Sequence, residues 1–571
     1  MGLKLASTIA ITTLFALVYA VVFVIGVWFL PSGTIGLLIM VALTLGIVFF
    51  QYLISPFIIG WIYRIEWIPY DYFQSSYPHL AEAVNKVVSF RGIKPPRIGI
   101  IHDMNPNAFT FGHTKNNARI VITDGILNYL NEKEQTAVIA HELGHVVHND
   151  FILMTIVFAI PLVLLTIARW AYFTSWFSGG GVRTSRDGNE AQYIRIALLI
   201  IAVLSFVAYY VAYLISLIVS RTREYYADQH AAELTENPNA LATGLVKIAY
   251  GLLVDRNIEE RNRSKVRALK GLGIFDPNAA KAFAVSSVGS SGMFSKDAIQ
   301  AAAAWDLFNP WAKYYQIFST HPLPAKRIMR LNEQCKNYGL TPEIDFSGAR
   351  KLMEEQAGKS LIDEFIVDLT INSLPTLIFI ALVGLTIAWF FGFVGFFNLG
   401  VFSFANNLIL LWAIGFYIIG FGSLFKTRFK YKSGFEPKSV LELVTNVKVS
   451  PIRTVPAILE GKIVGKGIPG YYFSDDLYFQ DNTGLMYIDY RFGLSIVDFF
   501  WAILRVKKLI GQSVRIKGWY RRGPSPYLQV DTIETEMGKR YRNYSKHMTY
   551  IWAVIAFLIG LLCFYIWFLT I

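Results

Sequence analysis

The sequence has few charged residues and almost no cysteine. Only 16% of its 571 residues are Asp, Glu, Lys or Arg, against about 25% in a typical soluble domain, while 54% are hydrophobic. This balance excludes a disordered chain, a fibrous protein and an ordinary soluble enzyme. The two cysteines, Cys335 and Cys563, are too few for a disulfide framework. We therefore expect a chain that crosses a membrane several times, with soluble segments between the crossings.

Seven apolar runs are long enough to cross a bilayer, which takes about 20 residues per helix. They lie at residues 5–30, 33–55, 152–178, 195–219, 373–393, 402–425 and 548–570. The first run is too long for a signal peptide, and we expect it to remain as an anchor. Ionisable residues are scarce inside the runs, which argues against a transporter or an ion pump.

Positive charge gathers at one end of these runs. The net charge is +13. The basic residues nearest the runs are Arg221, Arg223, Lys426, Arg428, Lys430, Lys432, Lys539, Arg540, Arg542 and Lys546. The positive-inside rule puts segments 56–151, 220–372 and 426–547 in the cytoplasm of a cell-membrane protein. Topology accounts for the charge, so we expect contact with the lipid bilayer and no nucleic-acid partner.

The segment before the third run carries a metal-binding pattern. Residues 135–150 read QTAVIAHELGHVVHND, with apolar residues at helical spacing and no proline. Residues four apart share one face of a helix, so His141 and His145 can both aim a ring nitrogen at one zinc ion. Glu142 lies beside them and can act as general base on an attacking water.

A catalytic zinc site needs a third protein ligand. His148 shares the helix face but lies about 10.5 Å from His141 along the axis, too far for the same ion. Glu224, in the stretch SRTREYYAD after the fourth run, returns to the same membrane face because the two runs form a hairpin. Asp228, one turn further, can hydrogen-bond a ligand histidine. On spacing alone, a mixed acidic and basic stretch at the end of a span explains Glu224 equally well.

Together, these motifs resemble the membrane zinc metalloproteases that include HtpX and the CAAX prenyl proteases. The resemblance rests on HELGH at 141–145 and on SRTREYYAD at 220–228 after a hydrophobic hairpin. Three shorter pieces also match: Asn107-Ala108-Phe109, the segment Val121–Leu130, and Thr320-His321-Pro322 followed by Arg327. The resemblance covers about residues 1–335 and is far more specific than HExxH alone.

The resemblance implies a zincin-type α+β catalytic domain in a predominantly α-helical, polytopic membrane protein. It makes His141, His145 and Glu224 the ligands of a Zn²⁺ cofactor and Glu142 the general base. The expected activity is that of a zinc metalloendopeptidase that cleaves polypeptides, mainly misfolded or damaged membrane proteins in quality control. Two alternatives stay open: processing of lipidated CAAX-type peptides, and a membrane scaffold with a vestigial zinc site.

The resemblance also assigns supporting roles. Asp228 would hold a ligand histidine, and Arg327 would fix its loop through an ion pair. His321 would stabilise the oxyanion, although a histidine before proline is as often a plain loop residue. The stretch Asn107-Ala108-Phe109 would belong to an edge strand, on which an extended peptide substrate pairs through main-chain hydrogen bonds.

The C-terminal third lies outside the resemblance. Short strand patterns at 457–464, 477–480, 485–489 and 513–520 are separated by glycine, proline and aspartate. They predict a small β-barrel-like, OB-like domain. OB folds often bind nucleic acid, and the basic residues Lys507, Lys508, Arg521 and Arg522 would suit it. Its position between two spans favours a substrate-handling or regulatory module instead.

Two further stretches have no counterpart in the compact catalytic core. Residues 255–315 read as a charged helix, a Ser/Gly linker and an alanine-rich helix near Ala301–Ala304. Either a lid over the active site or a tolerated surface insertion explains them. The apolar stretch Phe492–Leu504 is too short to cross a membrane, and we expect it to lie in the interface or to pack on the membrane domain.

The predicted organisation has seven segments. They are two N-terminal transmembrane helices (1–60), a first catalytic segment with the HExxH helix (61–151), a transmembrane hairpin (152–219), a second catalytic segment with the third ligand and the insertion (220–372), two transmembrane helices (373–425), the soluble OB-like domain (426–547) and a last transmembrane helix (548–571).

Overall fold

The computed structural model of the chain describes residues 34–104, 106–177, 188–254, 296–357, 360–390, 404–466, 477–490, 509–523 and 526–570. Two compact units emerge from its contacts, one formed by Met1–Ala284 with Tyr314–Phe346 and one by Val285–Lys313 with Ser347–Ile571. The predicted anchor at 5–30, the start of the insertion at 255–295 and the stretch 492–504 lie outside the described residues.

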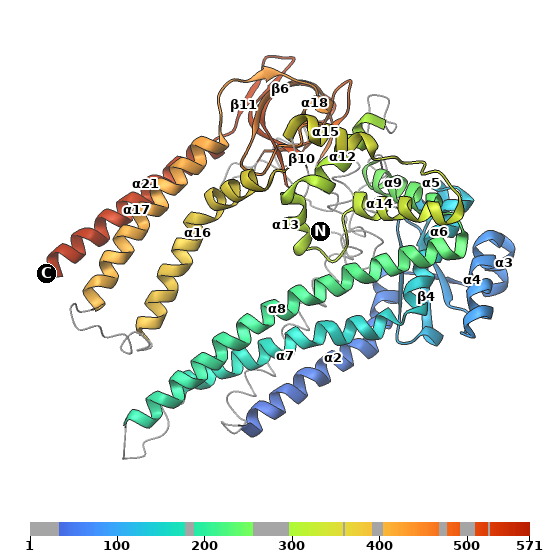
Figure 1. The fold of residues 1–571 in the computed structure, drawn as a ribbon, viewed down its shortest axis with the longest axis horizontal. Helices are drawn as coiled ribbons and strands as arrows, with labels where there is room; N and C mark the ends of the chain where they lie inside the picture. The colour runs from blue at the N-terminus through green and yellow to red at the C-terminus, as the bar shows by residue number, and fades with distance from the viewer. Residues whose placement is uncertain are drawn as a thin grey trace. The chain divides into compact units, whose positions relative to one another are not determined.

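The first unit consists of helices and one small sheet (Figure 1). Its helical elements are α2 (Thr34–Tyr63), α3 (Tyr70–Ser76), α4 (Pro78–Arg91), η1 (Lys115–Asn117), α5 (Asp124–Tyr129), α6 (Glu132–Val147), α7 (Asp150–Phe177), α8 (Gly188–Thr235), α9 (Pro238–Val254), α14 (Pro324–Cys335) and η3 (Lys336–Tyr338). Its strands are β1 (Glu66–Ile68), β2 (Arg97–Ile101), β3 (Ala108–Gly112) and β4 (Ala118–Thr123).

The sheet has the order β1-β2-β4-β3, so β3 is an edge strand. Strands β2 and β4 run parallel, whereas β1 and β3 are antiparallel to their neighbours. The edge strand predicted at Asn107-Ala108-Phe109 is confirmed as β3, which begins one residue later, at Ala108. Phe109 and Val121 bury their side chains beside Tyr63 at the end of α2. The sheet is thereby packed on the membrane helix that precedes it.

Helix α6 has well-defined ends. Asn131 and Glu134 form a capping box at its start, each side chain accepting a hydrogen bond from the other residue's backbone N–H. The helix ends at Val147, and Asn149 takes a left-handed conformation with φ of 56°. Helix α7 then begins at Asp150. This single turn joins the HExxH helix to a membrane span.

Helices α2, α7 and α8 lie side by side in the first unit (Figure 1). The Thr44 and Thr166 hydroxyls meet at 3.2 Å between α2 and α7, and Ser216 of α8 donates to the Val157 carbonyl of α7. Helix α8 is continuous over 48 residues. It therefore carries the apolar run and the stretch 220–228 on one rod.

The second unit combines membrane helices with a barrel (Figure 1). Its helices are α12 (Lys296–Phe308), α15 (Ser347–Ala357), α16 (Ile362–Phe390), α17 (Phe404–Lys430), α18 (Val440–Val444) and α21 (Ser545–Thr570), and α13 (Pro310–Ile317) runs across the division between the units. Its strands are β5 (Glu436–Pro437), β6 (Val455–Lys466), β7 (Leu477–Gln480), β8 (Leu485–Asp489), β9 (Ser513–Arg522), β10 (Pro526–Thr535) and β11 (Arg540–Arg542).

Five of these strands close into a ring. Strand β6 pairs with β7, β7 with β8, β8 with β10, β10 with β9, and β9 again with β6. Only the pair of β8 and β10 is parallel among these five. A closed five-stranded barrel with this order is the OB arrangement, and the four predicted strands fall within β6, β7, β8 and β9. The predicted fold class is thereby confirmed.

Six helices among the described residues are long and apolar enough to cross a membrane. They match the second to seventh predicted runs. Helix α16 begins at Ile362, not near residue 373, because its polar first turns pack on the barrel unit, where Asp368 pairs with Arg453 at 3.0 Å. Hydropathy locates the apolar part of such a helix and not its ends.

Two parts of the predicted second catalytic segment, residues 285–313 and residues 347–372, belong to the same unit as the barrel. The alanine-rich helix predicted near Ala301–Ala304 is confirmed as α12, and its Trp305 indole donates to the Val449 carbonyl of the second unit. Arg521 and Arg522, which sequence reasoning offered as nucleic-acid ligands, are each only 1% exposed. These two side chains therefore offer no charged surface for a polyanion.

Candidate metal centre

Helices α6 and α8 approach each other unusually closely. A Cβ atom placed on Gly144 would lie 2.9 Å from the Ala227 Cα and 3.2 Å from the His230 Cβ. His230 Nδ1 lies 3.0 Å from the Ala140 carbonyl oxygen and fixes the same contact. Only glycine leaves room for the α8 backbone here, so Gly144 sets the spacing between the two helices.

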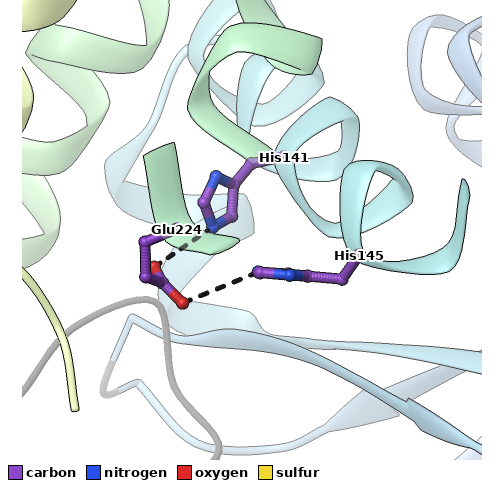
Figure 2. Close-up of side chains that lie close together, drawn as sticks. All are labelled: His141, His145 and Glu224. Atoms are coloured by element: carbon purple, nitrogen blue, oxygen red, sulfur yellow. Dashed lines mark ion pairs between the residues drawn. The ribbon is translucent and has the colours of Figure 1, made fainter. Parts of the chain in front are cut away.

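This spacing brings three potential metal ligands together. Figure 2 shows the imidazoles of His141 and His145 turned toward the carboxylate of Glu224. One ligand atom from each residue lies within 4.8 Å of the others. His141 Nε2 is 3.7 Å from Glu224 Oε2, and His145 Nε2 is 3.8 Å from Glu224 Oε1. These separations suit atoms that share one cation and not atoms that bond each other directly.

Two of these atoms are buried polar groups without a hydrogen-bond partner among the described residues. They are His141 Nε2 and Glu224 Oε2, and His141 is completely buried. A buried polar atom left in this state is costly unless something binds it. Two nitrogens and one oxygen form a donor set typical of a catalytic transition-metal site. The residues therefore fit a divalent cation.

The far nitrogen of each imidazole is held by a carboxylate. His141 Nδ1 lies 3.0 Å from Asp228 Oδ1, and His145 Nδ1 lies 2.6 Å from Asp150 Oδ2. These contacts fix both rings so that Nε2 faces the common centre. Asp150 in turn pairs with Arg223 of α8. Each candidate ligand histidine thus has its own orienting acid.

The carboxylates also set the charge of His145. Burial alone would lower the pKa of this imidazole, but the hydrogen bond to Asp150 and the charges of Glu224 and Glu142 outweigh burial and raise it to about 9. Farther along the turn, burial and the charge of Arg223 lower the pKa of His148. The centre is therefore strongly negative and suited to hold positive charge.

Arg327 is the counter-charge of this centre. Its side chain is completely buried and reaches two carboxylates of α8, those of Asp228 and Glu224. Its Nη2 lies 2.5 Å and its Nε 2.9 Å from Asp228, and its Nη1 lies 3.4 Å from Glu224 Oε2. A planar guanidinium that binds two carboxylates fixes their positions relative to each other.

Glu142 faces the edge strand. The Thr110 hydroxyl of β3 donates to Glu142 Oε2 at 2.5 Å. Thr110 lies between the buried Phe109 and Phe111, so its side chain points to the opposite face of the strand. Glu142 is only 2% exposed. The hydroxyl therefore fixes the carboxylate at the edge of the sheet.

His321 approaches from the loop after α13. Its Nδ1 lies 3.3 Å from Glu224 Oε1. The Ser319 hydroxyl donates to the His321 carbonyl at 2.9 Å and stiffens the turn. The structure thus places His321 beside the third candidate ligand.

The structure brings together the side chains that the sequence marked as ligands and supports. His148, excluded from the ligand set on distance, packs against Tyr226 and His230 instead. Of the predicted substrate stretch, Asn107 precedes β3 and donates its N–H to Thr123, while Ala108 and Phe109 are buried in the strand. Their predicted role in substrate binding would rest on the β3 backbone.

Sequence reasoning missed three residues of the centre: Asp150, Arg223 and Thr110. Asp150 had a signal, because an acid directly after the HExxH helix can fold back on its second histidine. Arg223 stands beside Glu224 and could have been paired with that acid. Thr110 gave no signal, since only the fold brings β3 to α6.

Comparison with known proteins supports the same reading. The profile of the family described as Peptidase family M48 matches residues 75–335. A protein named Protease HtpX homolog from Methanothermobacter thermautotrophicus is 38% identical over 250 residues, which cover 44% of this chain and 87% of the relative. Homologues of the same name from Pyrococcus furiosus and Aeropyrum pernix are 29% and 30% identical, over 55% and 57% of this chain and 92% and 98% of their own length.

No solved structure was found to match this chain. The family profile ends before the barrel, so the second unit's helices α16, α17 and α21 and the barrel lie beyond it. The matched part contains the two histidines, Glu142, Glu224 and the membrane hairpin between them. The chain therefore belongs to peptidase family M48, as an HtpX-like, multi-pass membrane metalloprotease.

Proposed function

We propose that the protein is a zinc-dependent endopeptidase whose active site faces the cytoplasm and which cleaves misfolded or damaged membrane proteins. The observation that carries this proposal is the convergence of His141, His145 and Glu224 with their buried, unbonded atoms. Glu142 and the edge strand β3 lie directly beside them. The proposed metal ligands, general base and substrate-binding strand thus lie next to one another.

Zinc is the ion we propose for this centre. Two imidazoles and one carboxylate match the three-ligand set of catalytic zinc sites, in which a fourth position stays open. When bound, the ion acts as a Lewis acid on a carbonyl and lowers the pKa of water toward about 7. His141, His145 and Glu224 would hold it, and Asp228 and Asp150 would keep the two imidazoles in the required tautomer.

Glu142 is the proposed general base. Its carboxylate lies one residue from His141 and is fixed by the Thr110 hydroxyl. From this position it takes a proton from the attacking water and passes it to the leaving amine. His321 would donate a hydrogen bond to the oxygen that gains negative charge.

The edge strand is the proposed substrate platform. Strand β3 pairs with β4 on one side only, so its other backbone edge can accept an extended peptide. A peptide bound in this way runs past Thr110 and therefore past Glu142. Main-chain pairing tolerates many sequences, which suits a protease for damaged proteins of varied sequence.

The cytoplasmic orientation rests on the charge distribution. Arg221 and Arg223 follow the apolar part of α8, and Arg428, Lys430 and Lys432 follow that of α17. Basic residues at these ends favour the cytoplasmic side. Processing of lipidated CAAX-type peptides remains the second candidate, because it would use the same ligands.

An apolar chamber near the site would favour the second candidate. Among the described residues, a cavity of about 340 Å³ lies between α7 and α8, lined by Leu165, Tyr172, Val203 and Phe206 among others. Leu165 lies 15 residues after Asp150, about 22 Å along the helix. This cavity is therefore too distant to seat a lipid whose attached peptide is being cut.

The test is cleavage of casein by the purified full-length protein in detergent. We expect the zinc-loaded wild type to cut casein, and Glu142→Gln to lose at least about a thousandfold in rate while it still binds one zinc ion per chain. A chelator should abolish wild-type activity, and added zinc should restore it. Glu132→Gln, a change in the exposed first turn of the same helix, is the matched control and should keep full activity.

Several results would contradict the proposal. Equal activity of Glu142→Gln and wild type would exclude the assigned base. A protein that binds no zinc, even after loading, would support the scaffold alternative. Cleavage of a prenylated CAAX peptide but not of casein would favour the processing alternative.

A further inference from the structure

One face of α8 carries more than the third candidate ligand. Ser220 and Arg221 lie four and three residues before Glu224, and Asp228 lies four residues after it, so all four residues lie along one side of the helix. Glu224 and Asp228 belong to the metal centre. Ser220 and Arg221, one turn earlier, have no part in the metal centre or in the catalytic roles assigned above. We call these four residues the site face of α8.

Arg221 holds the segment that leads to His321. Its Nη1 donates to the carbonyl oxygens of Gln316 at 2.8 Å, Ser319 at 2.6 Å and Ile317 at 3.2 Å. The last carbonyls of a helix lack partners within it, and a cation there is favoured by the helix dipole. Helix α13 ends at Ile317. Arg221 is therefore the C-terminal cap of α13, supplied from another helix.

Ser220 continues the same clamp. Its hydroxyl donates to the Thr320 carbonyl at 2.9 Å, directly before His321. After these contacts, His321 Nδ1 reaches Glu224 Oε1 on the same face of α8. The same helix, α8, therefore holds both the backbone of residues 316–320 and the imidazole of His321. A shift of this segment would move His321 relative to Glu224.

We infer that Arg221, assisted by Ser220, is a positioning residue that sets His321 against the metal centre. The inference rests on the proposed function, because it concerns the role given there to His321. The hydrogen bonds of the Arg221 guanidinium to other described residues go to backbone carbonyls, and none goes to a candidate ligand or to the general base. It acts through the loop, so its removal should affect the chemical step more than peptide binding.

The experiment is a double-mutant cycle with the zinc-loaded full-length protein. Arg221→Ala should lower kcat by about tenfold with KM changed less than twofold, because a small misplacement of a catalytic group lowers the rate steeply. Arg221→Lys keeps the charge with a smaller donor group and should recover part of the loss. In a His321→Ala background, Arg221→Ala should have no further effect. Zinc content should equal that of wild type in every variant.

A second readout does not depend on activity. Hydrogen exchange followed by mass spectrometry reports the amides of Phe318 and Ser319, which donate to the Tyr315 and Gln316 carbonyls. Arg221→Ala should speed their exchange at least about tenfold, whereas His321→Ala should leave it nearly unchanged. The matched control is Arg330→Gln. Arg330 is an exposed arginine whose guanidinium stacks on Tyr225 of α8.

The outcomes separate the two proposals. Losses that add in the double mutant, or a loop whose exchange is unchanged in Arg221→Ala, would overturn the positioning role while leaving the protease intact. An active His321→Ala enzyme that is still impaired by Arg221→Ala would overturn it as well. If the wild type cleaves nothing, the proposed function fails, and the exchange rates alone decide whether Arg221 holds the loop.

Discussion

Arg327 in the first unit and Arg521 in the second are both buried arginines, but their charges are compensated in different ways. Arg327 in the first unit binds two carboxylates, and Arg521 in the barrel lies against the Tyr431 ring, 5.0 Å from its centroid, with the Pro451 carbonyl at 3.4 Å. Within the described residues Arg521 has no carboxylate partner. Burial lowers the pKa of Arg521 to about 10, whereas at Arg327 the carboxylates outweigh burial and raise the pKa.

The difference between these two residues shows two ways in which a buried arginine can be accommodated. A buried ion pair seldom adds stability compared with apolar residues, but removal of one partner is costly. The first unit therefore retains Arg327 because two carboxylates have to stay charged and in place beside the ligands. In the barrel, Arg521 contributes to packing, and its polar end contacts a carbonyl oxygen. The predictions below test this contrast.

The largest effect is expected for Arg327→Met. This change leaves Asp228 and Glu224 as buried carboxylates without their cation, and we expect a loss of about 3–5 kcal/mol of unfolding free energy. Thermal unfolding in detergent and zinc analysis would measure stability and metal content together. A variant with wild-type stability and full zinc content would show that the arginine is dispensable in the first unit too.

A smaller loss is expected for Gly144→Ala. The added Cβ would lie 2.9 Å from the α8 backbone, which has to move away. We expect a cost of about 1–3 kcal/mol and weaker zinc binding, because Glu224 moves with α8. Gly46→Ala in α2 is the matched control, since nothing lies within 4 Å of its added Cβ. Equal behaviour of the two variants would contradict the close contact.

Arg521→Met should change little. Among the described residues, no carboxylate would lose its partner in this variant. We therefore expect a change in unfolding free energy of less than about 1 kcal/mol and casein cleavage within twofold of wild type. The same thermal unfolding assay applies, with Arg327→Met measured in parallel. A loss as large as that of Arg327→Met would remove the distinction between the two units.

The smallest effect is expected at an exposed charge cluster. His102, with a 65% exposed side chain, contacts Glu66 at 2.6 Å and Asp124 at 3.0 Å, and hydrogen bonds to these acids raise its pKa. The resulting stabilisation is present below about pH 6.5 and is lost as pH rises through the raised value. His102→Gln should thus lower the unfolding temperature slightly at pH 6, and not at pH 9. A loss that grows with pH would have the wrong sign.

Much of the architecture could be predicted because its signals are local. Apolar runs of about 20 residues mark the spans, and short strand patterns mark the barrel, since both depend on residues close together in the chain. The ends of α16 could not be found in this way. Its polar first turns are helical because Asp368 meets Arg453, which is far away in the sequence.

The site shows the same limit. His141 and His145 follow from helical spacing, and Glu224 could be reached through the hairpin. Thr110 and Arg221 could not, because their partners lie on elements that only the tertiary fold brings near. The spacing between α6 and α8 was also hidden, although Gly144 stood inside the motif. A glycine flanked by ligands can be read as a packing requirement only once the neighbouring helix is known.

Because α8 is one continuous helix, it fixes the distance between the bilayer and the proposed site of cleavage. The apolar part ends near Val219, and Glu224 follows five residues later, about 8 Å along the helix. A peptide bond cleaved at the centre that contains Glu224 would therefore have to lie close to the lipid headgroups. Loops that end within a few ångströms of the bilayer, or spans that have slipped partly out of it, come within reach without being extracted. Under the proposed function, the distance from the bilayer surface would thus determine which parts of a damaged membrane protein can be cleaved.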